Sequence, residues 1–168
     1  ATMSYGYGLT VTAAQLAQAV LVIANEGRWT PIRIFPASGV ATSKGRQIIS
    51  PAAAAAVRDL MVAVVEEEGT GKLAKIPGID VAGKTGTAER YDAEKREYVE
   101  DGHLASFVGF APARVAKIVA VVMIDAPNKD RFGGTAAAPA WQRIVSRALM
   151  LRGDLASVAV DDVVQGSR

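Results

Sequence analysis

Cysteine is absent from the 168-residue sequence, so the chain forms no disulfide and offers no thiolate ligand to a metal ion. Long apolar runs are missing too. The best candidate for a membrane-spanning helix, residues 57–65, is too short and is interrupted by Arg58 and Asp59, so we expect no membrane anchor here. Charge of one sign is not in excess, because 19 basic residues accompany 17 acidic ones and no dense run of Lys and Arg occurs. We therefore expect no nucleic-acid partner.

The opening residues, Ala-Thr-Met-Ser, include neither an initiator Met nor the charged and apolar regions of a signal peptide. We interpret the sequence as a segment of a longer polypeptide. Half of its residues are hydrophobic, which is enough to build the core of one globular domain.

Three helices are predicted from capping signals and apolar periodicity. Thr12 and Gln15 form a capping box before a first helix that ends at Gly27. Ser50 and Pro51 open a second helix, predicted to continue to Gly69. The third is expected over residues 135–151. The side chains predicted to be buried are Leu16, Val20 and Ile23 in the first helix, Val57, Met61 and Val64 in the second, and Trp141, Ile144, Val145 and Ala148 in the third.

Three strand-like segments follow the second helix, at residues 79–87, 104–111 and 118–125. The last is an almost continuous apolar run, which is typical of a central strand. Short connections favour an antiparallel meander, with the charged segment 89–101 predicted to be a solvated hairpin loop. We therefore predict an α+β fold in which helices cover an antiparallel sheet.

The most informative stretch is residues 81–88, Val-Ala-Gly-Lys-Thr-Gly-Thr-Ala. It places a cation, two hydroxyls and two glycines in a strand where bulky apolar residues are expected. An ordinary edge strand with Lys84 in solvent explains these residues equally well on their own. His103, the only histidine, has no Asp or Ser at a diagnostic spacing, so we predict a surface or strand-edge position without a catalytic role. The acidic residues of segment 89–101 lack the spacing of a calcium loop, and no metal site or cofactor is predicted.

Several segments, in the same order, resemble class B penicillin-binding proteins of the cell-division type (penicillin-binding protein 3 and 2), in the C-terminal part of their transpeptidase domain. Lys-Thr-Gly is one of three signature motifs of that superfamily. The resemblance covers residues 1–152, and we expect residues 153–168 to be a tail that is partly disordered. The other matching segments are residues 4–8 (Ser-Tyr-Gly-Tyr-Gly), 15–17 (Gln-Leu-Ala), 69–71 (Gly-Thr-Gly), 107–112 (Phe-Val-Gly-Phe-Ala-Pro) and 133–134 (Gly-Gly).

The resemblance implies roles for the Lys-Thr-Gly strand at the edge of an active-site cleft. Lys84 would supply positive charge beside the catalytic serine. Thr85 and Thr87 would bind a substrate carboxylate, and the Thr87 backbone N–H would form half of the oxyanion hole. Gly86 would let the substrate approach the backbone. Phe132 would line the cleft as an apolar wall, although Arg131 stands where similar proteins often have a second aromatic residue.

Two family motifs are missing, because no Ser-x-x-Lys and no Ser-x-Asn occur anywhere in the sequence. Both precede Lys-Thr-Gly in the family, so we expect the nucleophile, its lysine base and the membrane anchor to lie upstream in the same polypeptide. This chain alone is predicted to be inactive.

The function implied by the resemblance is that of a serine D,D-transpeptidase, which cross-links peptidoglycan stem peptides ending in D-Ala-D-Ala and is acylated by β-lactams. Implied partners are the upstream part of the polypeptide and cell-division proteins, on the outer face of the cytoplasmic membrane. Two alternatives remain open at this point: a serine β-lactamase or D,D-carboxypeptidase, and a non-catalytic scaffold or binding fragment.

Overall fold

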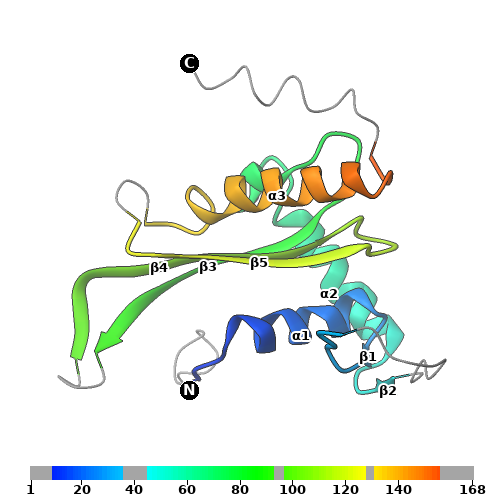
Figure 1. Cartoon of the computed structure of the whole chain (residues 1–168), viewed down its shortest axis with the longest axis horizontal. Coiled ribbons are helices and arrows are strands. Elements are labelled where there is room, and N and C mark those ends of the chain that lie inside the picture. Colours follow the sequence, from blue (N-terminus) through cyan, green and yellow to red (C-terminus); the bar gives the residue numbers. More distant parts are fainter. Residues whose placement is uncertain (1–8, 36–44, 93–96, 128–130, 156–168) are drawn as a thin grey trace.

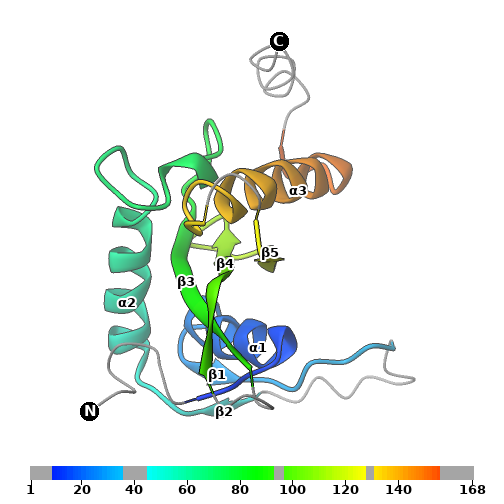
Figure 2. The same ribbon diagram turned by 90° about the vertical axis from the view of Figure 1, so that its left-hand side faces the viewer.

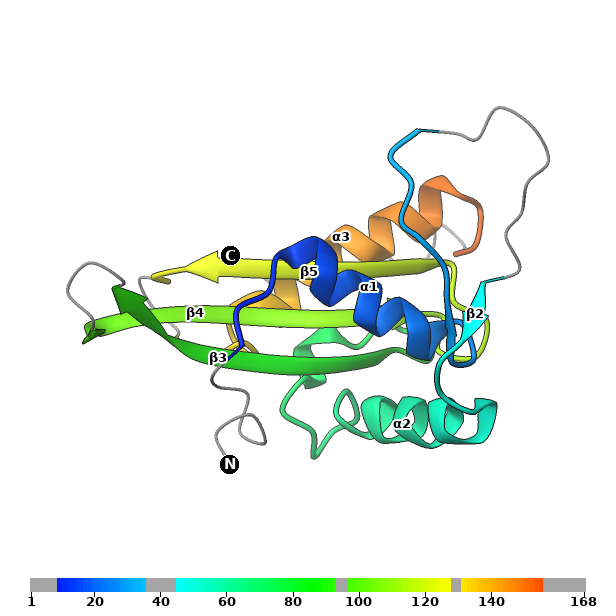
Figure 3. The same cartoon turned by 90° about the horizontal axis from the view of Figure 1, so that it is seen from below.

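The computed structural model describes residues 9–35, 45–92, 97–127 and 131–155. These residues form three layers, with one antiparallel sheet between helices (Figure 1). Helix α3 lies on one face and α1 on the other, against β4 and β5, while α2 runs beside the edge strand β3 (Figures 2 and 3). The predicted α+β fold is confirmed. No helix within the described ranges is long and apolar enough to cross a bilayer.

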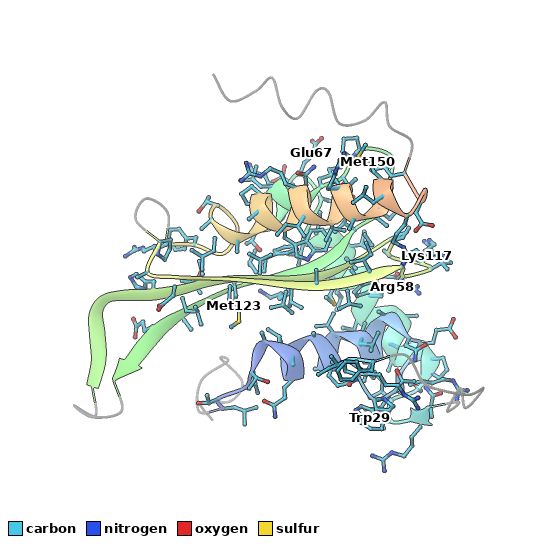
Figure 4. All side chains as sticks on the ribbon, in the orientation of Figure 1. Trp29, Arg58, Glu67, Lys117, Met123 and Met150 are labelled. Carbon is cyan, nitrogen blue, oxygen red and sulfur yellow. The ribbon has the colours of Figure 1, made fainter. Side chains whose placement is uncertain are left out.

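Helix α1 spans Ala13–Ala24 and begins with the predicted capping box, in which the Thr12 hydroxyl accepts from Gln15 N–H and the Gln15 side chain accepts from Thr12 N–H. Gly27 ends this region with φ +83°, a left-handed conformation that favours glycine. The short strands β1 (Arg28–Trp29) and β2 (Arg46–Gln47) then pair antiparallel below α1 (Figures 1 and 4). Residues 28–29 and 46–47 thus form a small two-stranded sheet, between α1 and α2 in the chain.

Helix α2 spans Pro51–Ala63 and starts as predicted, with the Ser50 hydroxyl accepting from Ala53 N–H at 3.1 Å. The prediction that it continues to Gly69 is wrong. Three adjacent glutamates follow, and their charge is unfavourable at the negative end of a helix dipole. The chain instead forms turns, a 3-10 helix η2 at Lys72–Ala74, and an ion pair between Lys75 and Glu66 at 2.9 Å.

The sheet consists of β3 (Ala82–Asp92), β4 (Glu97–Ala111) and β5 (Ile118–Asp125). Their order is β3-β4-β5 and all pairs are antiparallel, which confirms the meander. The central strand is β4, so the prediction of a central β5 is wrong within the described sheet. Segment 89–101 was also mispredicted as a loop. Its backbone extends the β3–β4 hairpin through the register shift between Glu89 and Tyr91, and only residues 93–96 separate the strands.

Two apolar clusters hold the layers together. On the α3 side, Trp141 is fully buried, meets the Phe107 ring edge-on at 5.2 Å, and donates from Nε1 to Ala120 O at 3.0 Å. On the other side, Phe110 and Val108 pack with Val20 and Met61. Figure 4 shows Met123 of β5 pointing to this second side.

Helix α3 spans Ala137–Leu151, two residues shorter at its start than predicted, because residues 133–136 form a turn in which the Thr135 hydroxyl donates to Phe132 O. Its buried stripe is centred on Trp141, Val145 and Leu149. Ile144 falls beside this stripe and is 57% exposed, which contradicts its predicted burial. Val57, on α2, is likewise 38% exposed.

Candidate active site

The Lys-Thr-Gly-Thr sequence lies on β3, which is an edge strand of the described sheet. Side chains of adjacent strand residues point to opposite faces. Thr85 is the partner of Phe107, which belongs to the α3-side core, whereas Lys84 is the partner of Val108, which packs on the α1 side. Thr85 and Thr87 therefore share the α3 face, and Lys84 starts from the opposite face.

The ammonium group of Lys84 turns back to its own strand, where Nζ donates to Thr85 O at 2.8 Å. The side chain is exposed, and within the described residues no carboxylate forms an ion pair with it. The positive charge of Lys84 thus lies along the sheet edge, beside the backbone carbonyl of Thr85.

Each threonine hydroxyl is held by a neighbouring segment. The Thr85 hydroxyl lies 3.0 Å from the Thr70 hydroxyl, and either oxygen can donate. The Thr87 hydroxyl accepts from Gly133 N–H at 3.2 Å. Two segments distant in sequence, the turn after α2 and the turn before α3, therefore meet β3 at these two residues.

The turn before α3 fits so closely because it contains glycine. A Cβ atom on Gly133 would collide with the Ser106 and Gly86 carbonyl oxygens, and one on Gly134 would collide with Thr70 O. Gly86 itself has no room for a side chain, because an added Cβ would lie 2.5 Å from Ser106 Oγ. The Ser106 hydroxyl donates to Gly86 O at 3.3 Å. Gly86 is therefore enclosed on both faces of the sheet, by the Ser106 side chain on one and by Gly133 on the other.

Phe132 directly precedes Gly133, whose N–H donates to the Thr87 hydroxyl, so Phe132 lies near β3 in space. Its side chain is 55% exposed, and the Arg131 guanidinium lies 5.2 Å from its ring centroid. That geometry is a cation–π contact. The arginine in the place of a second aromatic residue therefore contacts the phenylalanine.

Sequence reasoning assigned no role to Thr70 or Gly133, although both lie in segments that carry the family resemblance. Their signal was the glycine beside each of them, since a glycine that permits close backbone approach often marks a contact between segments. Which segments meet was not readable from one sequence, because Thr70 and Thr85 are brought together only by the turns after α2.

His103 occupies the central strand β4 and is half-buried, which corrects its predicted strand-edge or surface position. Its Nδ1 atom is buried and has no hydrogen-bond partner among the described residues. Within residues 9–35, 45–92, 97–127 and 131–155, no group of three or more His, Asp or Glu side chains could hold a metal ion.

Comparison with known proteins identifies the family to which this fold and site belong. The sequence profile of the penicillin binding protein transpeptidase domain matches residues 1–146. The probable peptidoglycan D,D-transpeptidase PenA of Neisseria flavescens is 39% identical over 154 residues, which cover 91% of this chain and 38% of that protein. The probable peptidoglycan D,D-transpeptidase FtsI of Caulobacter vibrioides is 32% identical, covering 88% of this chain and 27% of that protein.

Among solved structures, the apo transpeptidase domain of Burkholderia pseudomallei penicillin-binding protein 3 has a TM-score of 0.81 and 39% sequence identity, over 90% of this chain and 45% of that chain. Fold and site thus define a part of an α+β transpeptidase domain. The chain belongs to the penicillin-binding protein transpeptidase family, in class B. It spans less than half the length of each of these three relatives.

Proposed function

We propose that the chain supplies the Lys-Thr-Gly side of the active site in a serine D,D-transpeptidase that cross-links peptidoglycan stem peptides. The observation that carries this proposal is the edge strand β3. There the exposed Lys84 ammonium donates to the backbone carbonyl of Thr85, and the hydroxyls of Thr85 and Thr87 lie on the α3 face of the same strand. The nucleophilic serine and its lysine base would come from a part of the protein outside these 168 residues.

The proposed reaction is acyl transfer in two steps. The serine oxygen attacks the carbonyl carbon between the two D-Ala residues, the peptide C–N bond breaks, and the terminal D-Ala leaves with a proton on its amine. An amine of a neighbouring stem then attacks the acyl-enzyme carbonyl carbon and forms the cross-link. The ester C–O bond breaks, and the proton lost by the amine is transferred to the serine oxygen. β-Lactams would be attacked in the same way, and their acyl group would stay on the enzyme.

The Thr87 N–H is suited to stabilise the oxyanion of both steps. In an antiparallel strand, backbone groups of alternate residues point the same way, so Thr87 N–H shares the direction of Thr85 C=O. That carbonyl accepts from the Lys84 ammonium. The N–H and the positive charge would then serve the same edge, where one preorganised donor is worth about 3 kcal/mol in the transition state.

The threonine hydroxyls would bind the terminal carboxylate of the donor peptide. The Thr87 oxygen already accepts from Gly133 N–H, so its own hydrogen is available to an anion. Lys84 would add positive charge at the same edge. Gly86, which is enclosed by Ser106 on one face and by Gly133 on the other, would leave the backbone open to the substrate along the strand edge. Phe132, 55% exposed in the adjoining turn, would provide an apolar wall for the substrate.

The proposed substrate also indicates where in the cell the protein acts. Peptidoglycan lies outside the cytoplasmic membrane, so we place the protein's active domain there, with septal cell-wall synthesis and contact with cell-division proteins as its context. Residues 1–152 would form one part of the domain and residues 153–168 its tail. Residues 156–168 lie outside the described residues.

The test uses two separate samples of the full-length protein. One is acylated by a fluorescent penicillin, and the other receives a thioester acyl donor together with a D-amino acid as acceptor of the acyl group. A transpeptidase forms the aminolysis product, whereas a carboxypeptidase or β-lactamase releases the acyl group to water. A non-catalytic scaffold would show no label, and that result would contradict the proposal.

A further inference from the structure

The hydroxyl of Thr70 contacts the hydroxyl of Thr85, a proposed anion-binding group, and Thr70 has so far been given no role. It lies in the Gly69-Thr70-Gly71 turn, where Gly71 N–H donates to Val64 O at 2.8 Å. On its other side, Gly134 packs directly against the Thr70 carbonyl oxygen. The backbone of Thr70 is thus fixed by the end of α2 and by the turn before α3, and its hydroxyl lies 3.0 Å from that of Thr85.

The number of hydrogens at this pair of hydroxyls decides what Thr85 can bind. Each hydroxyl has one hydrogen to donate. If Thr85 donates to Thr70, it has none left for a carboxylate. If Thr70 donates to Thr85, the Thr85 hydrogen is free to point to an anion.

Thr87 offers a comparison on the same strand. Its partner is the backbone N–H of Gly133, which can only donate, so the Thr87 hydrogen is always left over. The direction of the Thr70–Thr85 bond has no such constraint, because either oxygen can donate. A negative ligand at Thr85 would favour one direction, since its charge attracts the Thr85 hydrogen.

We propose that Thr70 is a positioning residue for anion recognition: it donates to Thr85 Oγ1 and thereby directs the Thr85 hydrogen to the substrate carboxylate. This inference rests on the proposed function of the Lys84–Thr87 strand. Thr70 itself contacts Thr85 and makes no contribution to the reacting atoms. A purely structural role, in which the pair only fastens the turn to β3, predicts no dependence on the charge of the ligand.

The experiment measures second-order acylation rate constants of the full-length protein with a penicillin that carries its free carboxylate and with the methyl ester of the same penicillin. Thr70→Val removes the hydroxyl and keeps the side-chain shape. We expect the rate with the free acid to fall about three- to tenfold, the loss of one hydrogen bond. The rate with the ester should change less than about twofold, and Thr70→Ser should restore the rate with the free acid.

Two controls make the result specific. Thr70→Val should have no added effect in a Thr85→Val background, because its partner is already absent. Thr10→Val makes the same chemical change at an exposed threonine and should leave both rates unchanged. Equal losses with acid and ester, or an undiminished loss in the Thr85→Val background, would overturn the inference while leaving the transpeptidase proposal intact. Absence of acylation in the wild-type protein would overturn both.

Discussion

The central strand β4 and the edge strand β3 differ in what surrounds their side chains. Phe107 extends from β4 into the α3-side core, where it is fully buried against Trp141. Its pairing partner on β3 is Thr85, which is half-exposed. The Thr85 hydroxyl contacts the Thr70 hydroxyl, and the Thr85 carbonyl oxygen accepts from the Lys84 ammonium. The same sheet thus has a closed apolar centre and a polar edge.

The contrast shows how an edge strand can carry reactive groups without loss of stability. The centre keeps β3 in register through β4, so the Lys-Thr-Gly strand needs no large side chains of its own. Gly83 illustrates this, since an added Cβ would collide with the Phe107 ring that fills its place. Substitutions in the centre should therefore affect folding, and substitutions at the edge should affect acylation.

The largest expected effect is on folding and comes from Trp141→Ala. Removal of this fully buried ring leaves a cavity, loses the edge-on contact with Phe107 and leaves Ala120 O without its donor. We expect the free energy of unfolding to fall by about 3 to 5 kcal/mol. Denaturant unfolding of the full-length protein measures it. The matched control is Ile144→Ala on the exposed side of the same helix, and an equal loss there would refute the assignment of the buried stripe.

Lys84→Ala should give the reverse pattern, with a large kinetic effect and little change in stability. In the proposed role, the exposed Lys84 ammonium would stabilise charge in the transition state, so its loss should slow acylation about a hundredfold, or about 3 kcal/mol. Penicillin acylation kinetics and thermal melting measure the two quantities. Lys117→Ala, at an exposed turn lysine, is the control. Strong destabilisation with normal acylation of the folded fraction would make Lys84 structural.

Thr85→Val and Thr87→Val should each have a smaller, ligand-dependent effect. Valine keeps the β-branched shape that suits a strand but deletes the hydroxyl. We expect each to cost about 1 to 3 kcal/mol in acylation by a β-lactam with a free carboxylate. A neutral analogue should be affected much less. Equal losses for the charged and neutral ligands would show that the hydroxyls shape the strand instead of binding the anion.

The smallest effect should come from the surface ion pair of Lys75 and Glu66. The hydrogen bond from Lys75 to the Glu66 carboxylate raises the pKa of Lys75 above its ordinary value of 10.5. A raised pKa in the folded state gives stability that is present below the unfolded pKa and is lost as pH rises through the folded pKa. Lys75→Met should lower the melting temperature only slightly near pH 7, and still less once the pH has risen through the raised pKa of Lys75. A difference that grows with pH would contradict this sign.

Local signals in the sequence predicted much of the fold because they act within a few residues. The Thr12–Gln15 capping box, the Ser50 cap and the bounds of β5 are all confirmed. The end of α2 was mispredicted because the apolar pattern continues past Ala63, while the three glutamates oppose a helix there. The exposure of Ile144 depends on which stripe of α3 faces the sheet, and that is a tertiary property.

The sequence predicted which residues of β3 belong to the candidate site, but not which residues form hydrogen bonds with them. The composition of residues 81–88 marked Lys84, Thr85 and Thr87, since a core strand has no use for them. Their partners Thr70 and Gly133 lie 15 and 46 residues away along the chain. Such contacts follow from the packing of whole turns on the sheet, which no periodicity in the sequence encodes.

The central claim is that these residues form one side of a serine acyltransferase site whose nucleophile lies elsewhere in the protein. The most direct measurement is mass spectrometry of the full-length protein after reaction with penicillin, first intact and then as proteolytic peptides. We expect one adduct per protein, on a serine outside the 168 residues, and a much slower reaction in the Lys84→Ala variant. An adduct on any serine within these residues would contradict the claim.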